Sequence, residues 1–162
     1  MSNLAFALVA GLFVVIGYIQ LGDRAERIAQ QHDLAVDSER LVALLSEAQR
    51  HTEMFVVRGE AARARAALEQ LSAAEIRVGE LRESVLDKDM TALDRLALID
   101  ESIVDFRRQL RAFDPLGGNA DRREALAVEV QATGSVVLGA SRDLASHLSA
   151  NAKAQSDAGA AL

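Results

Sequence analysis

The feature that most constrains this chain is an unbroken apolar block over residues 4–21, LAFALVAGLFVVIGYIQL. Eighteen helical residues are roughly 27 Å long, which is close to the roughly 30 Å thickness of the hydrocarbon layer of a bilayer. No charged residue interrupts the block, and Tyr18 and Gln20 lie near one end, where polar tips reach the interface. The block therefore predicts a single transmembrane helix over 4–21.

The alternative reading of the block is a cleaved secretory signal. Such signals have a shorter apolar region of about 7–15 residues, with basic residues ahead and small residues at the cleavage site. Here Met1-Ser2-Asn3 precedes the block without a basic residue, and Gly22-Asp23 follows it. We therefore favour an uncleaved anchor. Because charge does not fix its orientation, we expect that a basic segment is missing from the start of this chain.

The composition of the chain and the length of the part that follows the apolar block indicate what class of protein this is. Residues 22–158 have the size of one domain. Half of all residues in the chain are apolar, but only 4% are aromatic, and alanine is abundant, which suits close packing between helices. The net charge of −6 argues against nucleic acid as a partner, and the absence of cysteine excludes disulfides and thiolate metal sites.

Apolar residues after the block recur at helical spacing, which predicts a first helix over 22–58 that is continuous with the membrane span. Gly59 is expected to end this helix in the left-handed conformation, and Glu60 to open the next helix. The alternative is a helix that runs through Gly59, where glycine would make the helix about 1 kcal/mol less stable than alanine would. The row that we expect to be buried is Leu34, Leu41, Leu45, Ala48, Thr52 and Phe55.

Three further helices follow from the same pattern, over 61–86, 91–113 and 121–157. Asp114–Asn119 contains Pro115 and two glycines, and it is the clearest break in the chain. Thr91 with Asp94, and Asp121 with Glu124, resemble N-terminal caps. The residues expected to face inward are Leu68, Leu71, Ile76, Val78, Leu81 and Val85; Leu93, Leu96, Ile99, Ile103, Phe106, Leu110 and Phe113; and Leu126, Val130, Val137, Leu144 and Leu148.

The helix lengths suggest how the helices are connected. The first and fourth helices are expected to be long and the second and third short, and short connections make sequence neighbours antiparallel. The predicted fold is all-α: an up-down-up-down antiparallel four-helix bundle, preceded by one transmembrane helix that is continuous with the first helix of the bundle.

One local motif gives a resemblance to a known family. Residues 48–60, AQRHTEMFVVRGE, are similar to a run near the end of the first helix in the sensor regions of methyl-accepting chemotaxis proteins, in particular the four-helix and helical-bimodular types. The chain keeps Arg50, Phe55, Arg58 and Gly59 of that pattern and departs from it at residues 52–54, so the resemblance implies no particular ligand.

The resemblance implies a ligand-sensing input domain of a chemoreceptor. It implies a homodimer in a bacterial inner membrane, with the sensor domain in the periplasm, that binds a small molecule or a ligand-loaded binding protein and passes binding inward by a small helix displacement. The chain is then a sensor fragment without its output module. A histidine kinase or a cyclase could carry the same input domain. A membrane-tethered structural or scaffold bundle is the alternative from another class.

The ligand-binding residues that we expect lie on the first and fourth helices. Arg50 and Arg58 offer guanidinium groups to an anionic, carboxylate-bearing ligand, and His51 shares a seven-residue row with Arg58 that would face a partner helix. Gln131 and Thr133 are expected at a similar height on the fourth helix. The alternative is that both arginines lie on a solvated face or pair with nearby glutamates, here Glu53 and Glu60.

The sequence does not point to catalysis, a cofactor or a metal. Its three histidines, His32, His51 and His147, are scattered and lack a metal-ligand spacing. No glycine-rich phosphate loop follows a strand, and no Ser-His-Asp or Cys-His order is evident. We expect a protein that is not an enzyme and that holds neither a cofactor nor a metal.

Overall fold

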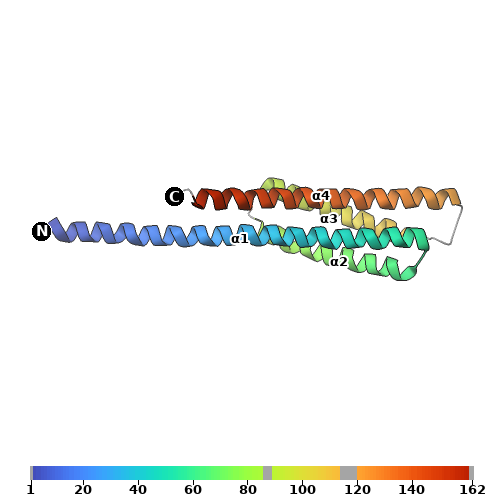
Figure 1. Ribbon diagram of the computed structural model, residues 1–162, viewed down its shortest axis with the longest axis horizontal. Coiled ribbons are helices and arrows are strands. Elements are labelled where there is room, and N and C mark those ends of the chain that lie inside the picture. The colour runs from blue at the N-terminus through green and yellow to red at the C-terminus, as the bar shows by residue number, and fades with distance from the viewer. Residues whose placement is uncertain (1, 86–88, 114–119, 161–162) are drawn as a thin grey trace.

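The computed structural model describes the backbone of residues 2–85, 89–113 and 120–160 (Figure 1). The side chains of residues 2–21, 23–24, 120, 122–123 and 159–160 lie outside the described residues. In these ranges the chain has four helices and no strand, so the all-α class is confirmed. The helices are α1 (Ser2–Arg58), α2 (Ala61–Ser84), α3 (Met90–Ala112) and α4 (Ala120–Ala160).

The four helices pack around one core. α1 and α3 each contact both α2 and α4. Figure 1 shows the two long helices, α1 and α4, side by side, with the shorter α2 and α3 along only part of their length. Both α1 and α4 project past α2 and α3 at the same end of the bundle, and this end carries the two termini of the chain.

The core follows the predicted pattern closely on α1, α3 and α4. All six residues of the predicted α1 row are buried, and Thr52 satisfies its hydroxyl by donating to the Ala48 carbonyl oxygen at 2.8 Å. On α2 the inward position expected for Ile76 is wrong, because its side chain is 66% exposed. The buried row of α2 instead uses Ala74, which follows Leu71 and precedes Val78 at spacings of three and four.

The connection between α1 and α2 is the predicted left-handed turn. Gly59 has a φ of 69°, a conformation that glycine adopts without steric cost, and its N–H donates to the Phe55 carbonyl oxygen at 2.8 Å. The prediction of a break at Gly59 is therefore confirmed. Glu60 is the N-terminal cap residue of α2, although its side chain makes no capping hydrogen bond.

The start of α3 differs from the sequence prediction. Asp89, not Thr91, is the cap residue, and its Oδ1 accepts a hydrogen bond from the Ala92 N–H at 3.1 Å. The predicted cap at Thr91 is wrong because the helix already begins at Met90. The predicted break over 114–119 lies outside the described residues. α4 begins at Ala120, so Asp121 belongs to its first turn.

The structure does not support the predicted membrane span. Among the described residues, no helix has the length and apolar character that crossing a bilayer requires. The described side chains of α1 begin at Gly22 and soon include Arg27 and Asp33, and such charges cost about 2.5–3.5 kcal/mol each at the bilayer centre. The single span over 4–21, and the inner-membrane and periplasmic location drawn from it, are corrected accordingly. The side chains of residues 4–21 lie outside the described residues.

Candidate functional site

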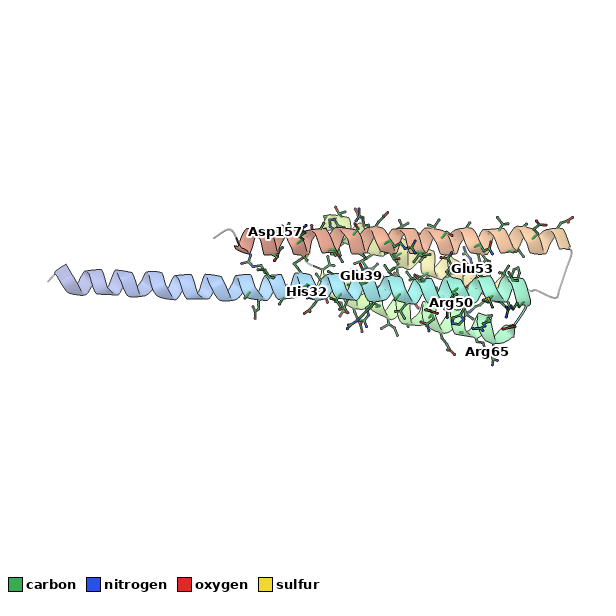
Figure 2. All side chains as sticks on the ribbon, in the orientation of Figure 1. His32, Glu39, Arg50, Glu53, Arg65 and Asp157 are labelled. Carbon is green, nitrogen blue, oxygen red and sulfur yellow. The ribbon has the colours of Figure 1, made fainter. Side chains whose placement is uncertain are left out.

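The arginines of the predicted site lie near the end of α1 that meets α2, and both pair with neighbouring glutamates. Arg50 is exposed (Figure 2), and its Nη2 lies 3.2 Å from Oε2 of Glu47, one turn earlier, not from Glu53. The Nη1 of Arg58 lies 3.9 Å from Oε1 of Glu60. Each guanidinium is therefore on the surface and beside a carboxylate.

The other predicted residues lie at the same height but on two different interfaces. The His51 side chain is only 16% exposed, and its Nδ1 lies 3.4 Å from Nη1 of Arg63 on α2. On α4, Gln131 is exposed and Thr133 is half-buried, beside the turn of α1 that faces Ser135. In the part of the chain that the structure describes, no hydrogen bond or ion pair joins His51 to these α4 residues. The structure therefore does not bring the five predicted residues into one cluster.

A polar cluster that the sequence did not predict lies at the opposite end of the bundle. Nε2 of His147 on α4 lies 3.0 Å from Oδ1 and 3.1 Å from Oδ2 of Asp89. Asn151, one turn further along α4, donates from Nδ2 to Oδ2 of Asp89 at 3.1 Å. Asp89 thus caps α3 and fixes the start of that helix to α4. The sequence signals of this cluster are the four-residue spacing of His147 and Asn151 and an aspartate, a preferred cap residue, at the start of α3.

A cavity of about 280 Å³ lies beside the polar cluster. Among the residues that the structure describes, its wall contains one carboxylate, three side-chain amides and three aliphatic side chains, and neither lysine nor arginine. Gln31 of this wall is only 8% exposed, and its Oε1 has no hydrogen-bond partner. All four helices contribute residues to it or end beside it: Gln31, Leu34, Val85, Asp89, Leu148, Asn151 and Gln155.

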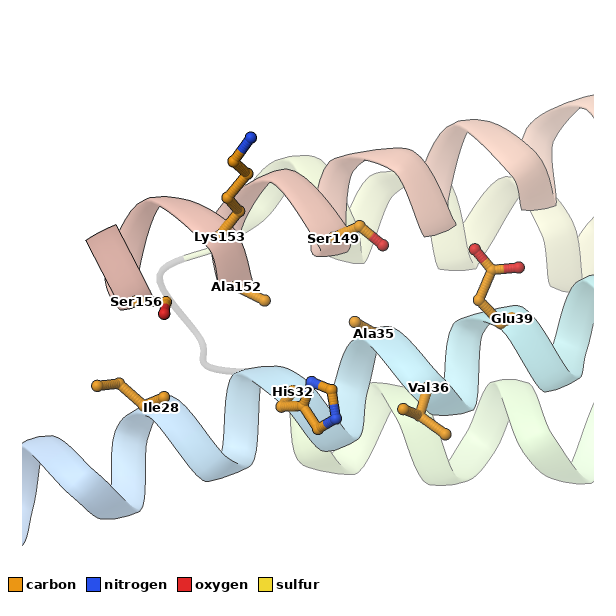
Figure 3. A pocket seen from close by; sticks show the side chains of 9 residues that line it. All are labelled: Ile28, His32, Ala35, Val36, Glu39, Ser149, Ala152, Lys153 and Ser156. Carbon is orange, nitrogen blue, oxygen red and sulfur yellow. The ribbon is translucent and has the colours of Figure 1, made fainter. Parts of the chain in front are cut away.

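A second hollow is a groove of about 450 Å³ between α1 and α4. Figure 3 shows Ala35 and Ala152 directed toward each other across it, with Lys153 extending away from α1. The polar side chains at its rim, which include His32 and Glu39, are exposed. The groove is therefore open, whereas the cavity beside Asp89 is lined in part by buried groups.

Comparison with known protein families, with curated proteins and with solved structures finds no match for this chain.

Proposed function

We propose that this chain is a ligand-sensing input module of the chemoreceptor type, built as an antiparallel up-down-up-down four-helix bundle. In this proposal binding displaces α4 relative to α1, and the module works by binding and movement without catalysis. The same module would serve a chemoreceptor, a histidine kinase or a cyclase. The observation that carries the proposal is the scarcity of polar contacts at the interface between α1 and α4.

Three of the four helix interfaces contain charged hydrogen bonds that fix their register. Arg77 Nη1 reaches Asp37 Oδ1 of α1 at 3.4 Å, and Arg107 of α3 reaches Glu75 of α2 at 2.6 Å. Between α3 and α4, Arg95 Nη1 donates to the Asp143 carbonyl oxygen at 2.7 Å. A sliding movement at any of these interfaces would break a charge-assisted bond, which is among the stronger side-chain contacts.

No charged hydrogen bond crosses between residues 28–58 of α1 and the side chains of α4 that the structure describes. Between residues 28–58 of α1 and the described side chains of α4, the hydrogen bond that crosses is Gln49 Nε2 to Ser135 Oγ, at the long distance of 3.5 Å. Small side chains, among them Ala35 and Ala152, line the groove that separates the two helices. Small sliding movements of packed helices are a known way to transmit a signal, and at this interface they would break no charged hydrogen bond between the described residues.

The arrangement of the helix ends supports the same reading. α1 and α4 leave the bundle at one end, beyond α2 and α3 (Figure 1). A displacement between them would therefore be carried past the rest of the bundle by both helices. We propose that the signal leaves the module through this pair.

The proposal is tested first by a thermal-shift screen of the full chain against amino acids, organic acids and amines. A ligand at one hundred times its Kd should stabilise the fold by about 2.7 kcal/mol. Paired spin labels at Ala43 and Asp157, which are exposed on α1 and α4, then report the distance between these helices. Labels at Ala43 and Glu83 on α2 are the matched control pair.

We expect the α1–α4 distance to change on binding and the α1–α2 distance to stay constant. Binding with both distances unchanged would contradict the proposal. The chain has no cysteine, so each labelled position is introduced without a background site.

The alternative role is a scaffold bundle that assembles through its surface. Several large apolar side chains are exposed, among them Val57, at 77%, and Val128. We propose a homodimer for the sensing module as well, so dimerisation alone does not separate the two roles. Sedimentation that shows higher assemblies, together with no thermal shift from any compound, would favour the scaffold.

A further inference from the structure

We propose that the cavity beside Asp89 binds a small organic ammonium ion with a short aliphatic group. The inference rests on the proposed sensing function only for the role of this ligand as a signal. Binding itself follows from the charge, hydrogen-bonding groups and size of the cavity. The proposed ligand has the opposite charge to the anionic ligand that the arginines near the other end of α1 suggested.

The charge of the cavity comes from the Asp89 carboxylate, which is held by two neutral N–H groups and by the His147 imidazole. Asp89 accepts hydrogen bonds from the Ala92 N–H and the Asn151 amide, and His147 Nε2 lies within 3.1 Å of both of its oxygens. Among the lining residues that the structure describes, none is a lysine or an arginine. A cation in the cavity would therefore lie beside the Asp89 carboxylate, which accepts hydrogen bonds from two neutral N–H groups.

The amide groups of the wall suit an N–H donor. Oε1 of Gln31 is buried without a partner, and a buried acceptor without a hydrogen bond is unfavourable. Asn151 uses its N–H group on Asp89, so its carbonyl oxygen remains an acceptor. An ammonium group has several N–H donors and no acceptor, which complements amide oxygens and a carboxylate.

The aliphatic part of the wall and the volume of the cavity determine the polarity and the size of the rest of the ligand. Leu34, Val85 and Leu148 are buried aliphatic side chains, and they favour an alkyl group over a second polar group. The 280 Å³ volume is near the lower end of ordinary ligand pockets, so the ligand is small. A divalent metal fits less well, because Asp89 is the only carboxylate among the lining residues that the structure describes.

The test is a titration of the full chain with isobutylammonium chloride, followed by NMR of the side-chain amides of Gln31, Asn151 and Gln155. Sodium chloride, isobutanol and sodium isobutyrate control for ionic strength, for shape and for the sign of the charge. We expect saturable shifts of these amides with the ammonium ion alone. In Asp89→Asn the Kd should rise at least about tenfold, because a hydrogen-bonded charge is lost. Asp94→Asn, on the exposed face of α3, should leave the Kd unchanged.

Three outcomes would overturn the proposal: amide shifts that do not saturate, equal shifts with salt or alcohol, or an unchanged Kd in folded Asp89→Asn. The first of these would mean that the cavity holds only water. Should Asp89→Asn fail to fold, Gln155→Phe fills the cavity from a partly exposed position, and an unchanged Kd in that variant also overturns it. Ammonium binding without a change in the α1–α4 distance would contradict the sensing function but not this site.

Discussion

The ring of Phe106 on α3 lies directly against the backbone of Gly134 on α4. A Cβ atom built on Gly134 would stand 3.0 Å from Cζ and 3.3 Å from Cε1 of that ring. Phe106 is fully buried, so the ring is held from its other sides by the core. The glycine therefore allows α3 and α4 to approach with a large aromatic side chain between them.

Replacing Gly134 by alanine should destabilise the fold by about 1 kcal/mol. The helix gains about 1 kcal/mol from the better helix former, but forcing a methyl group against a packed ring costs about 1–3 kcal/mol. Gly139→Ala, in the same helix with nothing within 4 Å, should stabilise the fold by about 0.5–1 kcal/mol. Urea unfolding of both variants measures the difference, and equal stabilisation by both would show that Phe106 can move away.

Gly59→Ala should destabilise the fold, because Gly59 has a φ of 69°. The left-handed conformation costs most residues with a Cβ about 1–2 kcal/mol. Asparagine adopts it more readily than alanine. Thermal unfolding should therefore rank glycine above asparagine and asparagine above alanine at this position. Gly79→Ala, at an exposed position inside α2, should have the opposite sign. Stabilisation by Gly59→Ala would mean that α1 continues through the turn.

Asp89→Ala should cost about 2 kcal/mol, because it removes the cap of α3 and the partner of His147 and Asn151. Thr91→Ala should change the free energy of unfolding by less than about 0.5 kcal/mol, since Thr91 is exposed and does not cap the helix. Chemical denaturation of the two variants checks this order. A larger loss at Thr91 would place the cap where the sequence alone had suggested it.

Leu41→Ala and Ile76→Ala should differ strongly. Leu41 is fully buried on α1, and truncating such a side chain typically costs about 2–5 kcal/mol. Ile76 is mostly exposed on α2, so its truncation should change stability by less than about 0.5 kcal/mol. Denaturation midpoints give both values, and a comparable loss at Ile76 would show that its surface is covered in solution.

The spacing of apolar residues in the sequence predicted the helices and most of the residues in the core. On α3 the buried positions from Leu96 to Leu110 carry large apolar residues at spacings of three and four, and on α1 leucines and Phe55 share the buried row with small or polar residues; this pattern identifies a buried face. On α2 the core contains Ala67 and Ala74, whereas the larger Ile76 is exposed. Hydrophobicity alone ranks isoleucine above alanine, so it assigned the wrong residue to the core. The helix packing, which the sequence does not state, decides that position.

The candidate site was much harder to predict. Gln31, Asp89 and Asn151 come from three separate helices or helix ends, and only the packing brings them to one cavity. The predicted residues Arg50 and Arg58 were chosen from a local motif, which places residues within one helix but not between helices. Asp89 lies two residues before the cap that the pattern suggested at Thr91, so its hydrogen bonds were not foreseen.

Because α1 is long and ends at a tight turn, a small rotation near Gly59 would produce a larger displacement at the other end of the helix. Only Gly59 and Glu60 separate α1 from α2, so the two helices are joined by a two-residue turn. α1 has 57 residues, which corresponds to a length of roughly 85 Å from this turn to the other end of the helix. A tilt of about one degree of α1 together with α2 against α4 would move that far end by about 1.5 Å, so a slight repacking beside Gly59 would produce a larger displacement at the far end of α1.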